Sequence, residues 1–111
     1  MGTKQNIAVI DIGKTNAKVV LVDGQTLQEL AVETTPNRVI TSAPYPHCDV
    51  DSIWGFILAS LTNFQNRFGV FAVSITAHGA CGALLDDKGN LAAPILDYEY
   101  KGIEEIAAQY E

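Results

Sequence analysis

The feature that most constrains this chain is an apolar segment near its start that ends in a carboxylate and a glycine turn. Ile7–Ile12 (IAVIDI) is a nearly continuous run of strand formers, typical of a central strand buried on both faces. A second run, residues 17–22 (AKVVLV), follows the turn at residues 13–16 and ends at Asp23-Gly24, a strong hairpin signal. The two runs predict an antiparallel pair that places Asp11 at the end of a buried strand.

The segments that follow complete a strand and helix pattern. Residues 27–34 (LQELAVET) predict a weaker third strand, so that the first three strands form an antiparallel meander. A helix follows, capped by Asp49 or Asp51 and ended by Gly69. Its apolar stripe is Ile53, Ile57, Leu61, Phe64 and Phe68, widened by Trp54 and Leu58. Residues 70–76 (VFAVSIT) return as a strand, and a helix between strands implies a crossover to a parallel neighbour.

Three further segments lie outside that pattern. Residues 36–46 contain three prolines and predict a loop. Residues 83–96 predict a second hairpin around a turn at 87–90, and residues 102–111 begin a helix whose pattern stops with the sequence. We therefore expect a partial α/β domain, β-β-β-α-β plus a hairpin, that continues beyond this chain.

Composition and charge exclude several functions. The chain has 111 residues and a net charge of −6, with no run of Lys or Arg, which disfavours nucleic-acid and anionic-membrane partners. No apolar run has the length of a membrane span. Cys48 and Cys81, without a signal-peptide pattern, predict reduced thiols in a cytoplasmic protein. Only 18% of the residues are charged, so we expect a surface that further chain covers. Left bare in the isolated chain, that surface would favour self-association into a homo-oligomer.

Residues 11–18 (DIGKTNAK) carry the most chemical information. A buried carboxylate at Asp11 is costly unless a cation or hydrogen bonds compensate, and Mg²⁺ held directly or through water would do so. Gly13 lets the backbone approach an anion closely, and turn amides with the Thr15 and Asn16 side chains can donate to phosphate oxygens. An ordinary hairpin in which Asp11 accepts turn amides accounts for the same residues equally well.

The string Gly13-Lys14-Thr15 does not predict a P-loop. That motif needs another glycine five positions earlier, where Ala8 stands. It also needs a helix directly after Lys-Thr, where residues 17–22 predict a strand.

Two segments together resemble a known family. Residues 11–18, opening a three-stranded meander, resemble the first phosphate motif of the actin/hexokinase/Hsp70 superfamily. Residues 74–91 (SITAHGACGALLDDKGNL) resemble the next signature of FGGY-type carbohydrate kinases, in which a strand ends in a His-Gly pair before a short hairpin. The spacing is that of the family, and the likeness covers nearly the whole chain. It implies a ribonuclease-H-like actin/hexokinase-type domain with a mixed sheet, of which residues 1–111 form the N-terminal part.

The same resemblance implies an activity and a cofactor. The complete enzyme would use ATP and Mg²⁺ to phosphorylate a ketose or polyol hydroxyl, with Asp11 holding the metal through water. Gly13, Thr15 and Asn16 would form the phosphate loop. The family usually has Thr or Ser where Lys14 stands, so this lysine either adds charge near the γ-phosphate or faces solvent. Lys18 matches a common basic position, and a solvated strand residue is the alternative.

The resemblance also implies a sugar pocket. His78 would hydrogen-bond a sugar hydroxyl beside Gly79; the alternative is a structural histidine at a strand end. The family commonly has a Trp-x-Asp-like signature downstream, whereas this chain has LDYEY at residues 96–100 without a tryptophan. Either Asp97 or Glu99 would then supply the carboxylate, or both belong to a solvated acidic loop.

Two alternatives and one gap remain. His47-Cys48 and His78 with Cys81 contain zinc-ligand types, but neither has the usual knuckle spacing, so we expect Cys48 in a loop and Cys81 as a small core residue. The rivals to a sugar kinase are another kinase of the superfamily, or a non-catalytic actin-like or chaperone-like module. The resemblance places the catalytic base beyond Glu111, in the remainder of the first domain, and the adenosine pocket in a second domain.

Overall fold

The computed structural model describes residues 5–79, 81–100 and 102. The chain divides into two compact units, which are described separately. One consists of Met1–Arg38 with Asp49–His78, and the other of Val39–Cys48 with Gly79–Glu111. The helix predicted at residues 102–111 lies outside the described residues, apart from Gly102.

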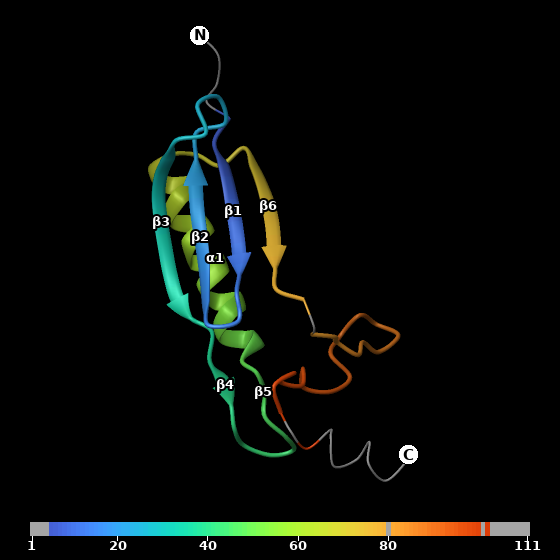
Figure 1. Cartoon of the computed structure of the whole chain (residues 1–111). Helices are drawn as coiled ribbons and strands as arrows, with labels where there is room; N and C mark the ends of the chain where they lie inside the picture. The colour runs from blue at the N-terminus through green and yellow to red at the C-terminus, as the bar shows by residue number, and fades with distance from the viewer. Residues whose placement is uncertain (1–4, 80, 101, 103–111) are drawn as a thin grey trace. The chain divides into compact units, whose positions relative to one another are not determined.

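The first unit is built on a four-stranded sheet (Figure 1). Its strand order is β3 (Glu29–Pro36), β2 (Asn16–Val22), β1 (Ile7–Ile12) and β6 (Ala72–Ala77). The first three strands pair antiparallel, and β6 lies parallel to β1 after a crossover through α1 (Val50–Arg67). The meander, the crossover and the mixed sheet predicted from the sequence are therefore confirmed.

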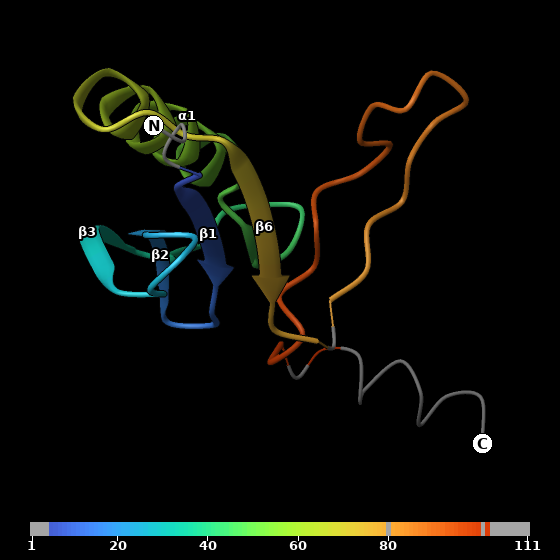
Figure 2. The same ribbon diagram turned by 90° about the horizontal axis from the view of Figure 1, so that it is seen from above.

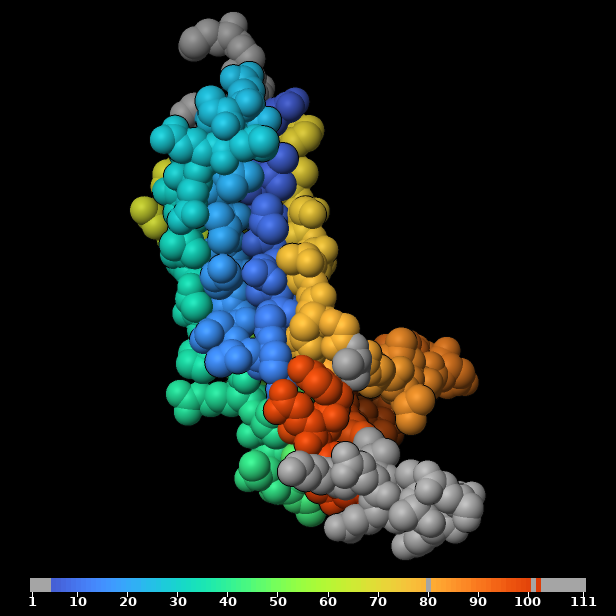
Figure 3. All heavy atoms as spheres, in the orientation of Figure 1, coloured from blue at the N-terminus to red at the C-terminus, as the bar shows by residue number. Residues whose placement is uncertain are grey.

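Helix α1 covers one face of this sheet, as the view from above shows (Figure 2). Figure 3 is seen from the opposite face, on which the four strands lie side by side without a helix in front of them. Within the described residues, no helix combines the length and the apolar character needed to cross a membrane.

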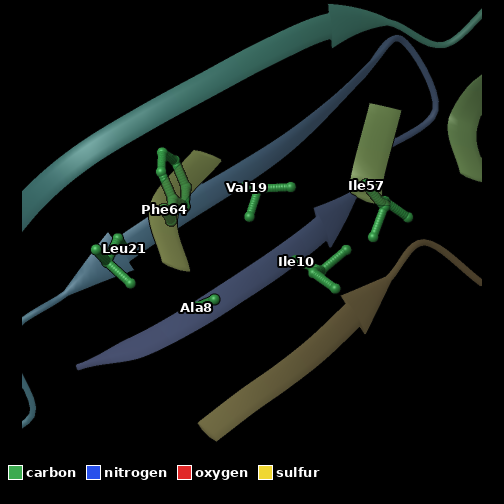
Figure 4. Packing of buried hydrophobic residues seen from close by; sticks show 6 residues of the cluster. All are labelled: Ala8, Ile10, Val19, Leu21, Ile57 and Phe64. Atoms are coloured by element: carbon green, nitrogen blue, oxygen red, sulfur yellow. The ribbon is translucent and has the colours of Figure 1, made fainter. Parts of the chain in front are cut away.

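The core lies between α1 and the two central strands (Figure 4). Asp49 caps the helix by accepting a hydrogen bond from the Ser52 amide at 3.2 Å, as one of the two predicted caps. The residues buried beneath the helix alternate along the strands, as expected for one face of a sheet. They are Ala8 and Ile10 of β1, Val19 and Leu21 of β2, and Ile57 and Phe64 of α1.

The predicted widening of the helix stripe is wrong. Trp54 is 59% exposed and Leu58 is 45% exposed. Both lie roughly 60–100° around the helix from Ile57, given 3.6 residues per turn. Helix α1 packs on β2 and β3, and the flank that carries Trp54 and Leu58 does not contact these strands closely enough to be buried.

The connection between β2 and β3 spans residues 23–28, longer than the residues 23–26 that the predicted strand bounds imply. The Asp23 carboxylate accepts hydrogen bonds from the amides of Gln25 at 2.8 Å and Thr26 at 3.1 Å. Leu27 takes a left-handed conformation with φ 61° and stays in the turn. The third strand therefore begins at Glu29 rather than at residue 27.

The second unit has little regular structure in its described part. Strands β4 (Val39–Ile40) and β5 (His47–Cys48) pair antiparallel, so β4 corrects the prediction of an unbroken loop at residues 36–46. Cys48 lies in a strand rather than a loop, since its amide donates to the Ile95 carbonyl at 2.8 Å.

The predicted second hairpin is present in reduced form. Leu85 and Leu91 make one isolated bridge, and the Asp86 carboxylate accepts from the Lys88 and Asn90 amides, each at 2.9 Å. The predicted burial of Cys81 is wrong, because its side chain is exposed.

Candidate functional site

The turn between β1 and β2 is closed by a single short hydrogen bond. The Gly13 amide donates to the Asn16 carbonyl at 2.9 Å. A Cβ atom at Gly13 would lie 2.9 Å from that same oxygen, closer than side-chain carbons approach a backbone oxygen. The glycine is therefore required by a close contact, whereas its φ is not among the positive ones of this chain.

Asn37, directly after β3, holds the same turn from the neighbouring strand. Its backbone amide donates to the Thr15 carbonyl at 2.8 Å, and its side-chain Nδ2 donates to the Gly13 carbonyl at 2.8 Å. No sequence motif identifies Asn37 as part of the turn. The contact joins positions 24 apart, and no local spacing marks it.

Asp11 lies at the end of β1 on the face of the sheet opposite α1, because its neighbour Ile10 packs under the helix. Asp11 is half-buried, and its carboxylate has no hydrogen-bond or ion-pair partner among residues 5–79, 81–100 and 102. The alternative role, in which Asp11 accepts turn amides, is therefore not seen.

Two other strands place polar residues beside Asp11. Lys18 of β2 and Thr76 of β6 are its direct partners in the sheet register, so all three share one face. Lys18 lies in the motif at residues 11–18, whereas Thr76 lies beside Asp11 only through the parallel register of β6 with β1.

The polar side chains of the turn differ in exposure. Thr15 and Asn16 are exposed, and Lys14 is half-buried. Asp11 provides carboxylate oxygens, Thr15 a hydroxyl oxygen and Asn16 an amide oxygen, the hard donors that Mg²⁺ prefers. In the part of the chain that the structure describes, no three His, Cys, Asp or Glu side chains are grouped closely enough to hold a metal ion. The loop therefore offers a cation one carboxylate together with neutral oxygens.

His78 lies at the same end of the sheet. Its amide donates to the Ile12 carbonyl at 2.9 Å and extends the pairing of β6 with β1 by one residue. The turn at residues 13–16 and the C-terminal ends of β3 and β6 share this end (Figure 1). The first unit therefore brings together Asp11, the turn and a half-buried His78.

The other predicted sugar-pocket residues belong to the second unit. Asp97 is half-buried; its amide donates to the Pro46 carbonyl at 2.9 Å, and its carboxylate accepts from the Glu99 amide at 3.4 Å. Gly79 and Glu99 are exposed. Within this unit Asp97 stabilises a local turn, whereas the Glu99 side chain extends into solvent.

No protein-family model matches this sequence, and no curated protein matches it. Solved structures do. A carbohydrate kinase from Novosphingobium aromaticivorans is 29% identical with a TM-score of 0.77, over 98% of this chain and 23% of that chain. A gluconate kinase from Lactobacillus acidophilus is 18% identical with a TM-score of 0.77, over 96% of this chain and 22% of that chain.

A glycerol kinase from Plasmodium falciparum, solved with ADP, is 14% identical with a TM-score of 0.71, over 100% of this chain and 24% of that chain. The chain therefore spans about a quarter of the length of these structures. The predicted fold and the resemblance to carbohydrate kinases are confirmed.

Proposed function

We propose that this chain, which has the fold of carbohydrate kinases of the FGGY/actin–hexokinase superfamily, carries the first phosphate loop and part of the sugar pocket of an ATP-dependent sugar kinase. The proposal depends chiefly on one observation. The Asp11 carboxylate is half-buried and has no partner among the described residues, beside a turn that is tightly closed.

A carboxylate in that position is suited to a cation. Removing part of its hydration without a compensating partner is unfavourable, and the Mg²⁺ of MgATP supplies the missing charge. Mg²⁺ typically keeps several waters and uses one or two carboxylates besides substrate phosphates, which matches a single Asp11. When bound, the metal neutralises charge on the phosphates during transfer.

The loop residues take different roles. The Gly13 amide is already bonded to the Asn16 carbonyl, so Gly13 contributes its missing side chain rather than a donor. Phosphate contacts then fall to the main chain and side chains of Lys14, Thr15 and Asn16. Lys18 shares a sheet face with Asp11 and adds positive charge beside the site.

The acceptor side is assigned to four residues. His78 stands at the β6 end next to the loop, and we assign it a hydrogen bond to a sugar hydroxyl. The sequence resemblance adds Gly79 as a further candidate for sugar binding, with either Asp97 or Glu99 supplying a carboxylate. The base that removes the hydroxyl proton lies in sequence beyond Glu111, in the remainder of a first domain that a second domain follows. The enzyme acts in the cytoplasm, where MgATP is abundant.

The test is sugar-dependent ATP turnover by the complete enzyme. MgATP is offered with a panel of ketoses and polyols, and sugar phosphate is followed by mass spectrometry. Multiple turnovers with at least one of these acceptors are expected. Nucleotide binding or hydrolysis that no sugar accelerates would instead indicate an actin-like or chaperone-like module. Transfer only to acids such as acetate or pantothenate would indicate another kinase of the superfamily.

A further inference from the structure

We propose that Asn37 is a positioning residue of the phosphate loop: it orients the peptide groups of the turn so that their amides are directed toward the nucleotide phosphates. This inference rests on the proposed function. It assigns a role to a residue outside the 11–18 motif, directly after strand β3.

The turn lacks one backbone hydrogen bond of an ordinary tight hairpin. In a tight hairpin, the two residues that flank the loop usually exchange two backbone hydrogen bonds. Here Gly13 donates to the Asn16 carbonyl, but the Gly13 carbonyl accepts from Asn37 Nδ2 at 2.8 Å instead of from the Asn16 amide. Asn37 Nδ2 thus holds the Gly13 carbonyl, and the Asn16 amide makes no bond that closes the turn.

The two hydrogen bonds to Asn37 fix the direction of the peptide groups in the turn. In a planar trans peptide, the carbonyl and the following amide point in opposite directions. Asn37 binds the carbonyls of Gly13 and Thr15, one on each side of Lys14. The amides of Lys14 and Asn16 must then point away from Asn37, and backbone amides that share a direction can bind an anion together.

The contact with the Gly13 carbonyl depends on the side chain of residue 37. The backbone amide of Asn37 would bond Thr15 whatever its side chain, so only the Gly13 contact needs an amide group. Aspartate has the same size but would place an acceptor against the Gly13 carbonyl. Alanine would leave that carbonyl to the Asn16 amide and so consume a phosphate donor.

The experiment compares Asn37→Ala and Asn37→Asp with wild type in the complete enzyme. Isothermal titration calorimetry with MgADP gives the affinity, and steady-state kinetics gives KM for ATP and for the sugar. We expect MgADP affinity to fall and KM for ATP to rise by roughly three- to tenfold with alanine, the effect of one lost hydrogen bond, and by more with aspartate. KM for the sugar should change little.

Asn63→Ala is the matched control. Asn63 is also half-buried, and its Nδ2 donates to the Glu33 carboxylate at 2.6 Å, away from the turn. It should lower the melting temperature without changing MgADP affinity. Asn37 variants that lose only melting temperature would overturn the inference. A wild-type enzyme that binds no MgADP would overturn the proposed function and this inference with it, whereas tight wild-type binding unchanged by either Asn37 variant overturns the inference alone.

Discussion

Replacing glycines by alanine at matched positions tests the close contact in the loop. At Gly13 the new Cβ would lie 2.9 Å from the Asn16 carbonyl, whereas ordinary contacts begin about half an ångström further out. The oxygen must move, although it accepts the hydrogen bond that closes the turn. Overpacking of this kind costs roughly 1–3 kcal/mol, and the lower entropy of the unfolded alanine chain offsets roughly 0.4–1 kcal/mol. A net loss of roughly 0.5–2 kcal/mol follows.

Two other glycines separate the possible causes. Gly55, inside α1, has no atom within 4 Å of an added Cβ, so Gly55→Ala should stabilise the chain by roughly 0.5–1 kcal/mol. Gly69, after the helix, also has open space but a φ of 84°. Gly69→Ala should therefore cost roughly 1–2 kcal/mol through backbone strain alone.

The assay is urea unfolding of the 111-residue chain, followed by circular dichroism. The variants at residues 13 and 55 should shift the free energy of unfolding in opposite directions. A Gly13→Ala chain as stable as wild type, with Gly55→Ala behaving as expected, would refute the close contact at Asn16. In the complete enzyme, Gly13→Ala should also weaken MgADP binding, because the displaced oxygen belongs to the proposed phosphate loop.

Three further predictions concern function. Asp11→Asn in the complete enzyme should lower turnover by roughly 10²–10³-fold while the fold is kept, and near-normal turnover at saturating Mg²⁺ would contradict the assignment. His78→Ala should lower kcat/KM for the sugar by roughly 5- to 150-fold with little change in MgADP affinity, whereas unchanged sugar kinetics with a lower melting temperature would show a structural histidine. The isolated 111 residues should fold and self-associate but produce no sugar phosphate, as circular dichroism, sedimentation and mass spectrometry would check; repeated turnover would mean that a complete site lies within them.

The sequence predicted the elements whose signals are local. Ile7–Ile12 has the predicted bounds, since an uninterrupted apolar run beside a glycine turn has few alternatives. The Asp49 cap and the parallel β6 followed from capping chemistry and from the handedness and length of a crossover. Asp11 at the end of a central strand was predictable for the same reason.

What the sequence did not predict depends on contacts between distant residues. Asn37 meets Gly13 only because β3 ends beside the turn, and Thr76 meets Asp11 only through the register of β6. The exposure of Trp54 follows from the position of α1 over β2 and β3, which helical periodicity cannot fix. Such positions are set by packing and by register rather than by propensity.

The two edges of the sheet differ in charge and in apolar exposure. β3 carries Glu29, Glu33 and Pro36, which protect an edge strand from further pairing. β6 (AVSITA) carries neither charge nor proline, and its Val73 and Ile75 are 48% and 67% exposed. Both lie in register with core residues of β1, yet α1 does not cover them. Pairing with further chain and pairing with a second copy would use this same edge, so the two predicted uses of the apolar surface exclude each other.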